Sequence, residues 1–135
     1  MVSLSSPISE LVNGVISTPS GIIITTHSGA GRIIAELIDQ AGAGYTIAGD
    51  NTILAINITE NAIQSTVSGL TQPISSLVES VNSTPSGIVV TTSVSGAGII
   101  AELIDQANIG NTIAGDDTIL VIGSSENAIN NLLNG

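Results

Sequence analysis

The sequence has almost no positive charge. Its 135 residues contain one Lys or Arg, which is Arg32, against 11 Asp and Glu, which gives a formal net charge of −10 at pH 7 with His27 neutral. Proteins that bind nucleic acids or anionic membranes use several basic side chains to neutralise phosphate groups. We therefore expect neither nucleic acid nor membrane as a partner, and a cation or cationic group is the better-matched ligand.

Aromatic residues and cysteine are also scarce. Phe, Trp and Cys are absent and Tyr45 is the single aromatic residue, although 42% of the chain is hydrophobic. The core must therefore be aliphatic, and the chain has neither disulfides nor thiolate metal sites. Only 9% of the residues are charged, against about 25% in an average soluble domain. We expect the protein to cover part of this weakly charged surface with copies of itself.

Long apolar runs are missing as well. No stretch approaches the roughly 18 consecutive apolar residues of a membrane span, and the N-terminus lacks the basic start and apolar run of a signal peptide. We expect no signal peptide and no transmembrane segment. The sequence leaves the location open between the cytoplasm and an assembly on a cell or spore surface.

The sequence does contain an internal repeat with an offset of 66 residues. Residues 33–54 and 99–120 agree at 18 of 22 positions without a gap. The SGAG motif occurs at residues 28–31 and 95–98, an offset of 67, which predicts one local slip. We expect a tandem duplication with units at residues 1–69 and 70–135.

Each unit shows the pattern of a ββαββα domain. TPSG at residues 18–21 and Gly-Asp-Asn at residues 49–51 are typical of tight turns between paired strands. Ser28 and Thr59 are placed to cap the helices that follow them. In the first unit we predict strands at residues 11–16 and 21–26, a helix at 30–40, strands at 46–48 and 52–56, and a helix at 60–67. The helix at 30–40 should bury Ile33, Ile34, Leu37, Ile38 and Ala41.

This order predicts an α/β fold, more narrowly an α+β two-layer sandwich. In each of the two units, four antiparallel strands form one sheet and two helices cover one of its faces. The helices of a unit cannot cover the second face of its sheet. Residues 22–24 are continuously apolar, which is typical of a strand buried on both faces. We expect the other unit or another chain to cover the second face.

The segment TIAGDDTILVI at residues 112–122, together with the preceding helix of the type SGAGxIIAELID, resembles the C-terminal domain of bacterial arginine repressors. The resemblance extends over both units. It implies a ββαββα domain that forms trimers, which pair into hexamers and bind L-arginine between trimers through acidic residues. The winged helix-turn-helix domain of these repressors has no counterpart in the sequence, so the resemblance implies an oligomerisation module and not a complete repressor.

Carried over to this sequence, the ligand set that the resemblance implies has six members: Asp39, Asp50, Asn51, Asp105, Asp116 and Asp117. The Gln that the family has seven residues before the helix-end aspartate is replaced by Arg32 or Gly98. The Gly-Asp-Asn and Gly-Asp-Asp segments are equally typical of hairpin turns without a ligand. Calcium binding is a third possibility, although no loop has the spacing of a known calcium motif.

Arg32 is predicted to lie on the exposed side of its helix. It is either an ordinary solvent-exposed residue or an interface residue that fills the acidic pocket of a neighbouring subunit. A catalytic triad of His27, Ser28 and Asp39 is not expected, because the second unit has Ser93 in place of His27 and no nucleophile-elbow pattern is present.

We therefore expect no catalytic residue, no metal site and no cofactor, with L-arginine as a possible ligand. The predicted function is that of a non-enzymatic structural protein that assembles with itself into a closed oligomer or a filament. The alternative is an effector module that binds L-arginine or another cationic small molecule.

Overall fold

The computed structural model describes residues 4–42 and 44–134, which form two units. The N-terminal unit is Pro7–Gln72, and the C-terminal unit is Pro73–Gly135 together with Met1–Ser6. Whereas the sequence pattern predicts a division after residue 69, the contacts within the structure divide the chain after Gln72. They also group the N-terminal residues with the C-terminal unit.

Both units have the predicted ββαββα order, preceded in each case by a short 3-10 helix that the sequence analysis did not predict. The N-terminal unit contains η1 (Ile8–Leu11), β1 (Val12–Thr18), β2 (Gly21–Thr26), α1 (Gly31–Gln40), β3 (Tyr45–Ala48), β4 (Thr52–Ile56) and α2 (Glu60–Ser68). The C-terminal unit contains η2 (Ile74–Leu77), β5 (Val78–Thr84), β6 (Gly87–Thr92), α3 (Ala97–Ala107), β7 (Asn111–Ala114), β8 (Thr118–Ile122) and α4 (Glu126–Asn134). Within the described residues, no helix is long and apolar enough to cross a membrane.

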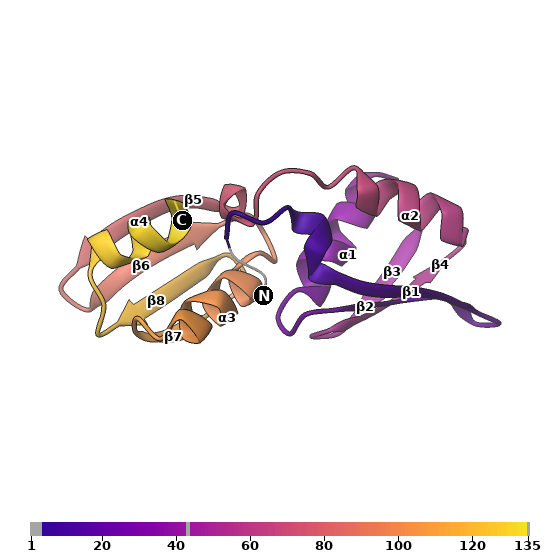
Figure 1. Cartoon of the computed structure of the whole chain (residues 1–135). Coiled ribbons are helices and arrows are strands. Elements are labelled where there is room, and N and C mark those ends of the chain that lie inside the picture. Colours follow the sequence, from indigo (N-terminus) through magenta and orange to yellow (C-terminus); the bar gives the residue numbers. More distant parts are fainter. Residues whose placement is uncertain (1–3, 43, 135) are drawn as a thin grey trace. The chain divides into compact units, whose positions relative to one another are not determined.

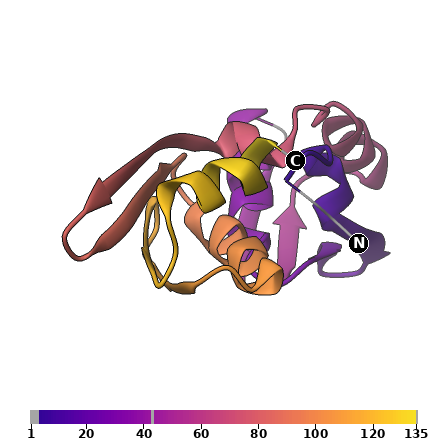
Figure 2. The same cartoon turned by 60° about the vertical axis from the view of Figure 1, so that its left-hand side comes forward.

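Each unit is a two-layer sandwich, which confirms the predicted fold class. The strand order is β1-β2-β4-β3 in one sheet and β5-β6-β8-β7 in the other, and all neighbours are antiparallel. In the N-terminal unit α1 packs against β3 and β4, and α2 packs against β1. The two helices of each unit therefore lie on one side of its sheet (Figures 1 and 2).

The edge strand and the second helix of each unit are joined by a hydrogen bond at the same place. In the N-terminal unit the Ser17 hydroxyl on β1 donates to the Glu60 carboxylate on α2 at 2.8 Å. The pair of Ser83 and Glu126 repeats this bond at 2.8 Å in the C-terminal unit. The second helix begins, as predicted, at a capping hydroxyl: the Ala62 N–H donates to Thr59 Oγ1 at 3.1 Å.

The core of each unit lies between the helices and one face of the sheet. Its largest buried members in the N-terminal unit are Ile8, Leu11, Ile22, Ile24, Ile33, Ile34, Ile38, Ile53 and Ile63. Ile23, between the buried Ile22 and Ile24, is only half-buried, so its own unit does not cover the second face of this strand; the expected cover by the other unit or another chain stays a prediction. Ala41, predicted to lie on the buried face, is exposed because α1 ends at Gln40.

At the start of α1, a backbone N–H group is bonded by a turn and not by a capping side chain, so the predicted cap at Ser28 is wrong. The residue before the helix is Ala30, which makes no side-chain capping bond. Instead, the Gly31 N–H donates to the backbone oxygen of Asp50 at 2.9 Å. The turn between β3 and β4 thus accepts one of the N–H groups that a helix start leaves free.

The offset of 66 residues holds through this region, so the predicted local slip is wrong. Gly29 and Ser95 occupy equivalent left-handed positions with φ of 82° and 69°. The helices that follow begin at Gly31 and Ala97, again 66 residues apart. The shifted SGAG motif therefore reflects substitutions at aligned positions and not an insertion.

Gly31 and Ala97 offer a natural comparison of the same site with and without a Cβ atom. A Cβ at Gly31 would lie too close to the backbone oxygen of Gly49 for both atoms to stay in place. Ala97 carries that Cβ, and its N–H bond to the backbone oxygen of Asp116 is 3.3 Å, compared with 2.9 Å at Gly31. The turn of the C-terminal unit thus lies slightly further from the helix.

We expect Gly31→Ala to change the free energy of unfolding by less than about 1 kcal/mol, because the higher helix propensity of alanine offsets the displacement of the turn. Urea denaturation followed by circular dichroism measures this change, and Ala97→Gly is the matched reverse substitution. A loss above about 2 kcal/mol would show that the turn of the N-terminal unit cannot move as its counterpart does.

Candidate functional site

The sheet face opposite the helices carries a row of apolar side chains, one from each strand. Ile16 on β1 lies opposite Ile23 on β2, which lies opposite Leu54 on β4, which lies opposite Ile47 on β3. Directly opposed residues of antiparallel strands share a face. Because Ile24 points into the helix-covered core, its neighbour Ile23 and the whole row point away from the helices. We call these four residues the apolar row.

The ends of the apolar row are strongly exposed. Ile16 is 58% exposed and Ile47 is 63% exposed, and Tyr45, two residues before Ile47 on the same face, is 70% exposed. Single exposed apolar residues are common on proteins, whereas contiguous ones mark surfaces that associate. The sequence analysis expected the second sheet face to be covered because residues 22–24 are continuously apolar, but it did not identify the row that the strand register forms.

The C-terminal unit repeats the apolar row with one polar substitution. Its members are Asn82, Val89, Leu120 and Ile113 in the same register. Ile113 is 62% exposed, whereas Asn82 takes the place of Ile16. The helix-free face of the N-terminal unit is therefore the more apolar of the two.

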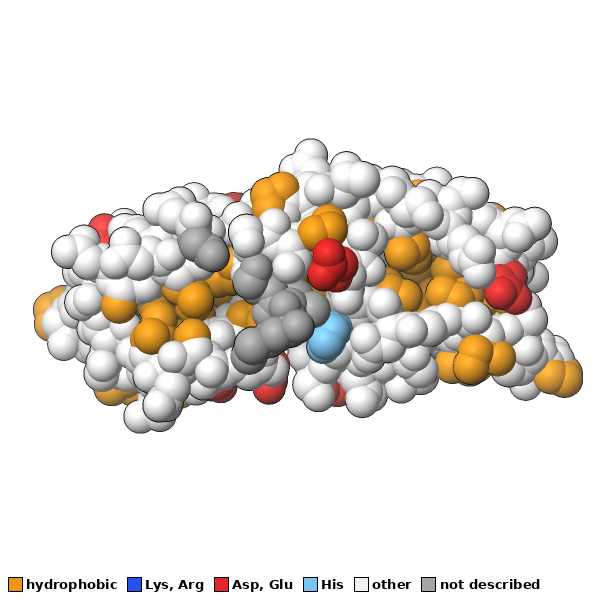
Figure 3. Space-filling model, viewed as in Figure 1, with side chains coloured by type: hydrophobic (Ala, Val, Ile, Leu, Met, Phe, Trp, Pro, Cys, Tyr) orange, Lys and Arg blue, Asp and Glu red, His pale blue; other side chains and the backbone are white. Residues whose placement is uncertain are grey.

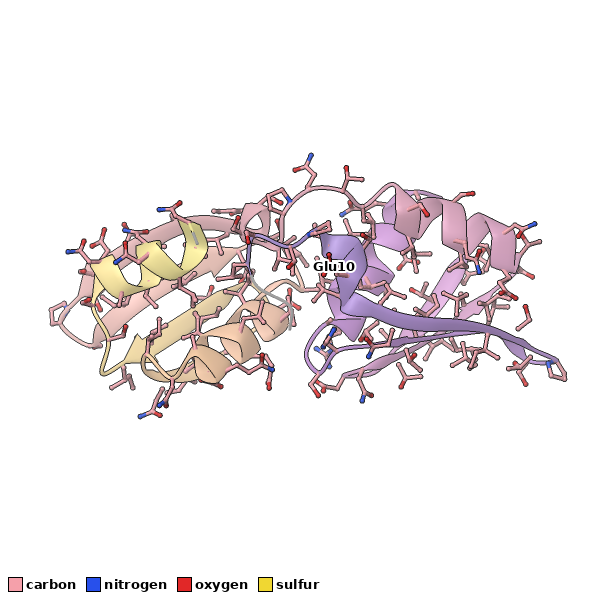
Figure 4. The ribbon with its side chains drawn as sticks, in the orientation of Figure 1. Glu10 is labelled. Carbon is pink, nitrogen blue, oxygen red and sulfur yellow. The ribbon has the colours of Figure 1, made fainter. Side chains whose placement is uncertain are left out.

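Uncharged side chains also dominate the surface seen in the space-filling view. Hydrophobic side chains gather between α2 and β1 of the N-terminal unit and below α4 of the C-terminal unit, and charged side chains are few (Figure 3). One of these charged residues is Glu10, an exposed residue of η1 (Figure 4). Its counterpart in the C-terminal unit is Ser76, whose hydroxyl donates to the backbone oxygen of Pro73 at 2.6 Å.

The predicted helix-end acids are held in the same way in both units. The Thr46 hydroxyl on β3 lies 3.0 Å from each carboxylate oxygen of Asp39, to which it donates. Thr112 and Asp105 repeat this arrangement at 2.9 and 3.0 Å. Both aspartates are exposed, so each carboxylate is oriented by one hydroxyl and keeps acceptor capacity toward solvent.

The predicted turn acids have a structural role through their backbone. In addition to the Asp50 bond to α1, the backbone oxygen of Asn51 accepts the Thr26 N–H at 2.9 Å, which ties the turn to the end of β2. The side chains of Asp50 and Asn51 are exposed. These bonds support the interpretation of this segment as a structural turn.

Side-chain contacts at this turn occur in both units, since the Thr52 hydroxyl donates to Asn51 Oδ1 at 3.2 Å, and the C-terminal unit adds a contact from Ser95. The Ser95 hydroxyl lies 3.4 Å from a carboxylate oxygen of Asp116, and the Thr118 hydroxyl donates to Asp117 at 3.1 Å. The backbone oxygen of Asp117 accepts the Thr92 N–H at 2.8 Å. The second carboxylate of Gly-Asp-Asp is therefore partly engaged within its own turn.

The structure does not bring the helix-end and turn acids of one unit together. The turn contacts Gly31 at the start of α1, whereas Asp39 lies near its end. At about 1.5 Å per residue, the step of eight residues from Gly31 to Asp39 spans about 12 Å along the helix. Within the described residues, no group of three or more His, Cys, Asp and Glu is placed to hold a metal ion. Within each unit, the helix-end acid and the turn acids therefore lie at opposite ends of the first long helix.

Arg32 lies where the sequence predicts, as an exposed residue in the first turn of α1. His27 directly follows β2 and comes before α1, whereas Asp39 lies near the end of α1. Glycine replaces Arg32 in the C-terminal unit as Gly98. The interface role of Arg32 stays a prediction.

Comparison with known families gives two matches to one domain. The family described as "Arginine repressor, C-terminal domain" matches residues 8–72 and again residues 74–135. These ranges coincide with the two structural units. The chain belongs to the arginine repressor C-terminal domain family. It is a tandem duplication of that domain, as the sequence repeat predicts, and the domain is involved in oligomerisation and arginine binding.

Two relatives are arginine repressors from Histophilus somni, strains 2336 and 129Pt. Each is 41% identical to this chain over 63 residues, an alignment that covers 44% of the chain and 41% of the relative. The chain therefore corresponds to less than half of the length of these repressors. No solved structure matches the chain.

Proposed function

We propose that this protein is a non-enzymatic structural protein that assembles with itself through the helix-free faces of its two arginine repressor C-terminal domains. The observation that carries this proposal is the apolar row, whose end residues Ile16 and Ile47 are more than half exposed in the isolated chain. The family to which the domains belong is involved in oligomerisation, which supports the same conclusion.

Burial of the exposed ends of the apolar row favours association. Burying an exposed isoleucine contributes about 1.5 to 3 kcal/mol. The net charge of −10 per chain opposes the approach of two copies, but the row itself has no charge to desolvate. Because each chain carries two such faces, association can close into a ring or continue as a filament.

The assembled mass tests this proposal. Light scattering and electron microscopy over a range of concentrations should show particles of several chains, whose mean mass rises with concentration and falls on dilution. A monomer at every concentration would contradict self-assembly through the apolar row.

An alternative function, an effector module for L-arginine or another cationic small molecule, is favoured by the helix-end acids. Asp39 and Asp105 are exposed and are oriented by equivalent threonines in both units. An oriented carboxylate is suited to a charge-assisted bond from a guanidinium group. Because the turn acids of the same unit lie at the other end of the helix, we infer that this site is complete only in an assembly.

For this alternative we expect millimolar L-arginine to raise the melting temperature, since a ligand that binds only the folded state stabilises it. Asp116→Ala with Asp117→Ala should abolish the shift and leave the circular dichroism spectrum unchanged. Glu10→Ala with Glu79→Ala removes the same charge from two exposed positions outside the turn. This control should still show the arginine-dependent rise of the melting temperature. If the unmodified protein shows no shift with arginine, the alternative fails.

A further inference from the structure

Residues 4–6 are part of the C-terminal unit, although they come before the whole N-terminal unit in the sequence. The Ser75 N–H donates to the backbone oxygen of Leu4, and the Ile74 N–H donates to that of Ser6, both at 2.9 Å. The Leu4 side chain is only 1% exposed. A short segment from the start of the chain therefore completes η2 and the adjoining core.

Residues 70–72 fill the equivalent place in the N-terminal unit. The Ser9 N–H donates to the backbone oxygen of Leu70 at 3.0 Å, and the Ile8 N–H donates to that of Gln72 at 2.9 Å. The repeat offset of 66 residues relates Leu4 to Leu70 and Ser6 to Gln72. We call residues 4–6 and 70–72 the two tail segments.

The two tail segments differ in how they reach the unit that they complete. Residues 70–72 follow α2 directly, so the N-terminal unit is completed by its own chain end. Residues 4–6 have no such link to α4 and are connected to the C-terminal unit only through the N-terminal unit. Both segments continue without a linker into the first residue of a unit, which is Pro7 after residues 4–6 and Pro73 after residues 70–72.

From this arrangement we propose that residues 4–6 of one copy occupy the tail position in the C-terminal unit of another copy. This inference rests on the proposed self-assembly and adds a second contact to the apolar row. Within one chain, residues 70–72 complete the N-terminal unit and continue directly into the C-terminal unit. In the proposed junction, residues 4–6 of the next chain complete the C-terminal unit and continue directly into the N-terminal unit of that next chain. Such a junction is heterologous and leaves a free tail segment and a free acceptor at the ends, so it propagates.

The exchange changes no contact within a unit. The two backbone bonds and the burial of Leu4 are the same whether the segment comes from its own chain or from another. Only the effective concentration of the segment differs, so rising protein concentration favours the exchanged form. Exchange of identical elements is a low-cost route to assembly for this reason.

Leu4→Asp tests the exchange, and Leu70→Asp, at the equivalent but only half-buried position of the other tail segment, is the control. A carboxylate at position 4 must be desolvated to enter the buried site, so the concentration at which long assemblies form should rise at least about 100-fold. Leu70 completes the N-terminal unit of its own chain and takes no part in the exchange. Leu70→Asp should therefore leave the concentration at which long assemblies form within about threefold of that of the unmodified protein. Light scattering and electron microscopy measure both.

A cross-linking experiment keeps the inference testable if Leu4→Asp unfolds the C-terminal unit. Full-length ¹⁵N-labelled chains with a photoreactive leucine analogue at position 4 are unfolded, mixed with unlabelled chains, refolded together and irradiated. Cross-links from the labelled chain to unlabelled peptides containing residues 74–77 are expected.

The outcomes separate this inference from the proposed function. If the unmodified protein never assembles, both fail. If it assembles but all cross-links stay within labelled chains, or Leu4→Asp folds and assembles like the control, the exchange is overturned and assembly through the apolar row stands.

Discussion

Replacing Ile16 and Ile47 by glutamate is expected to raise the dissociation constant between chains by about 10² to 10⁴-fold. Each isoleucine contributes about 1.5 to 3 kcal/mol when it is fully buried in an interface, and every 1.4 kcal/mol corresponds to a factor of ten. The new carboxylates would also have to be desolvated without a partner. Sedimentation velocity across a concentration series measures the change.

The matched control is Ser20→Glu with Ser86→Glu. It adds two negative charges at exposed turns away from the apolar row, so it reproduces the added repulsion without removing apolar surface. The control should assemble nearly as well as the unmodified protein. If both double variants shift the association equally, net charge and not the apolar row governs assembly.

Gly21→Ala is expected to lower the free energy of unfolding of the N-terminal unit by roughly 2 to 4 kcal/mol. Gly21 has φ of 145°, and a Cβ there would lie 2.6 Å from the backbone oxygen of Ala55. The clash is with the backbone of β4, which is paired to β2 and to β3, so relief requires displacement of a central strand. Urea denaturation monitored by circular dichroism measures the loss.

Gly87 provides an independent repeat of this test. It has φ of 147°, and an added Cβ would lie 2.6 Å from the backbone oxygen of Val121, so Gly87→Ala should cost the C-terminal unit a similar amount. Gly31→Ala, where only a turn must yield, should cost less. A loss below about 0.5 kcal/mol at both Gly21 and Gly87 would mean that the sheet adjusts more readily than its pairing indicates.

The helix-end and turn acids illustrate how far the resemblance alone could define a site. It selected Asp39 and Asp50 in the N-terminal unit, and the structure shows one carboxylate oriented by Thr46 and one turn tied to α1. Their separation depends on the length of α1 and on which of its ends the turn meets. Arginine binding by these acids stays a prediction.

The sequence by itself determined the elements and their order. Alternation, helical spacing, the TPSG turn and the cap at Thr59 are local features, decided by neighbours within a few residues. The 66-residue repeat likewise determined that there are two similar domains. These inferences were confirmed because local patterns carry enough information to distinguish a helix from a strand.

Only the tertiary structure decided where distant backbones meet. It replaced the predicted Ser28 cap with the oxygen of Asp50, aligned Ile16, Ile23, Leu54 and Ile47 into one row, and placed Leu4 in the C-terminal unit. Strand register and segment docking depend on residues far apart in the chain, and a shift of one residue would move each side chain to the other face. No local pattern fixes that choice, because the free energy that selects it comes from burying the whole core at once.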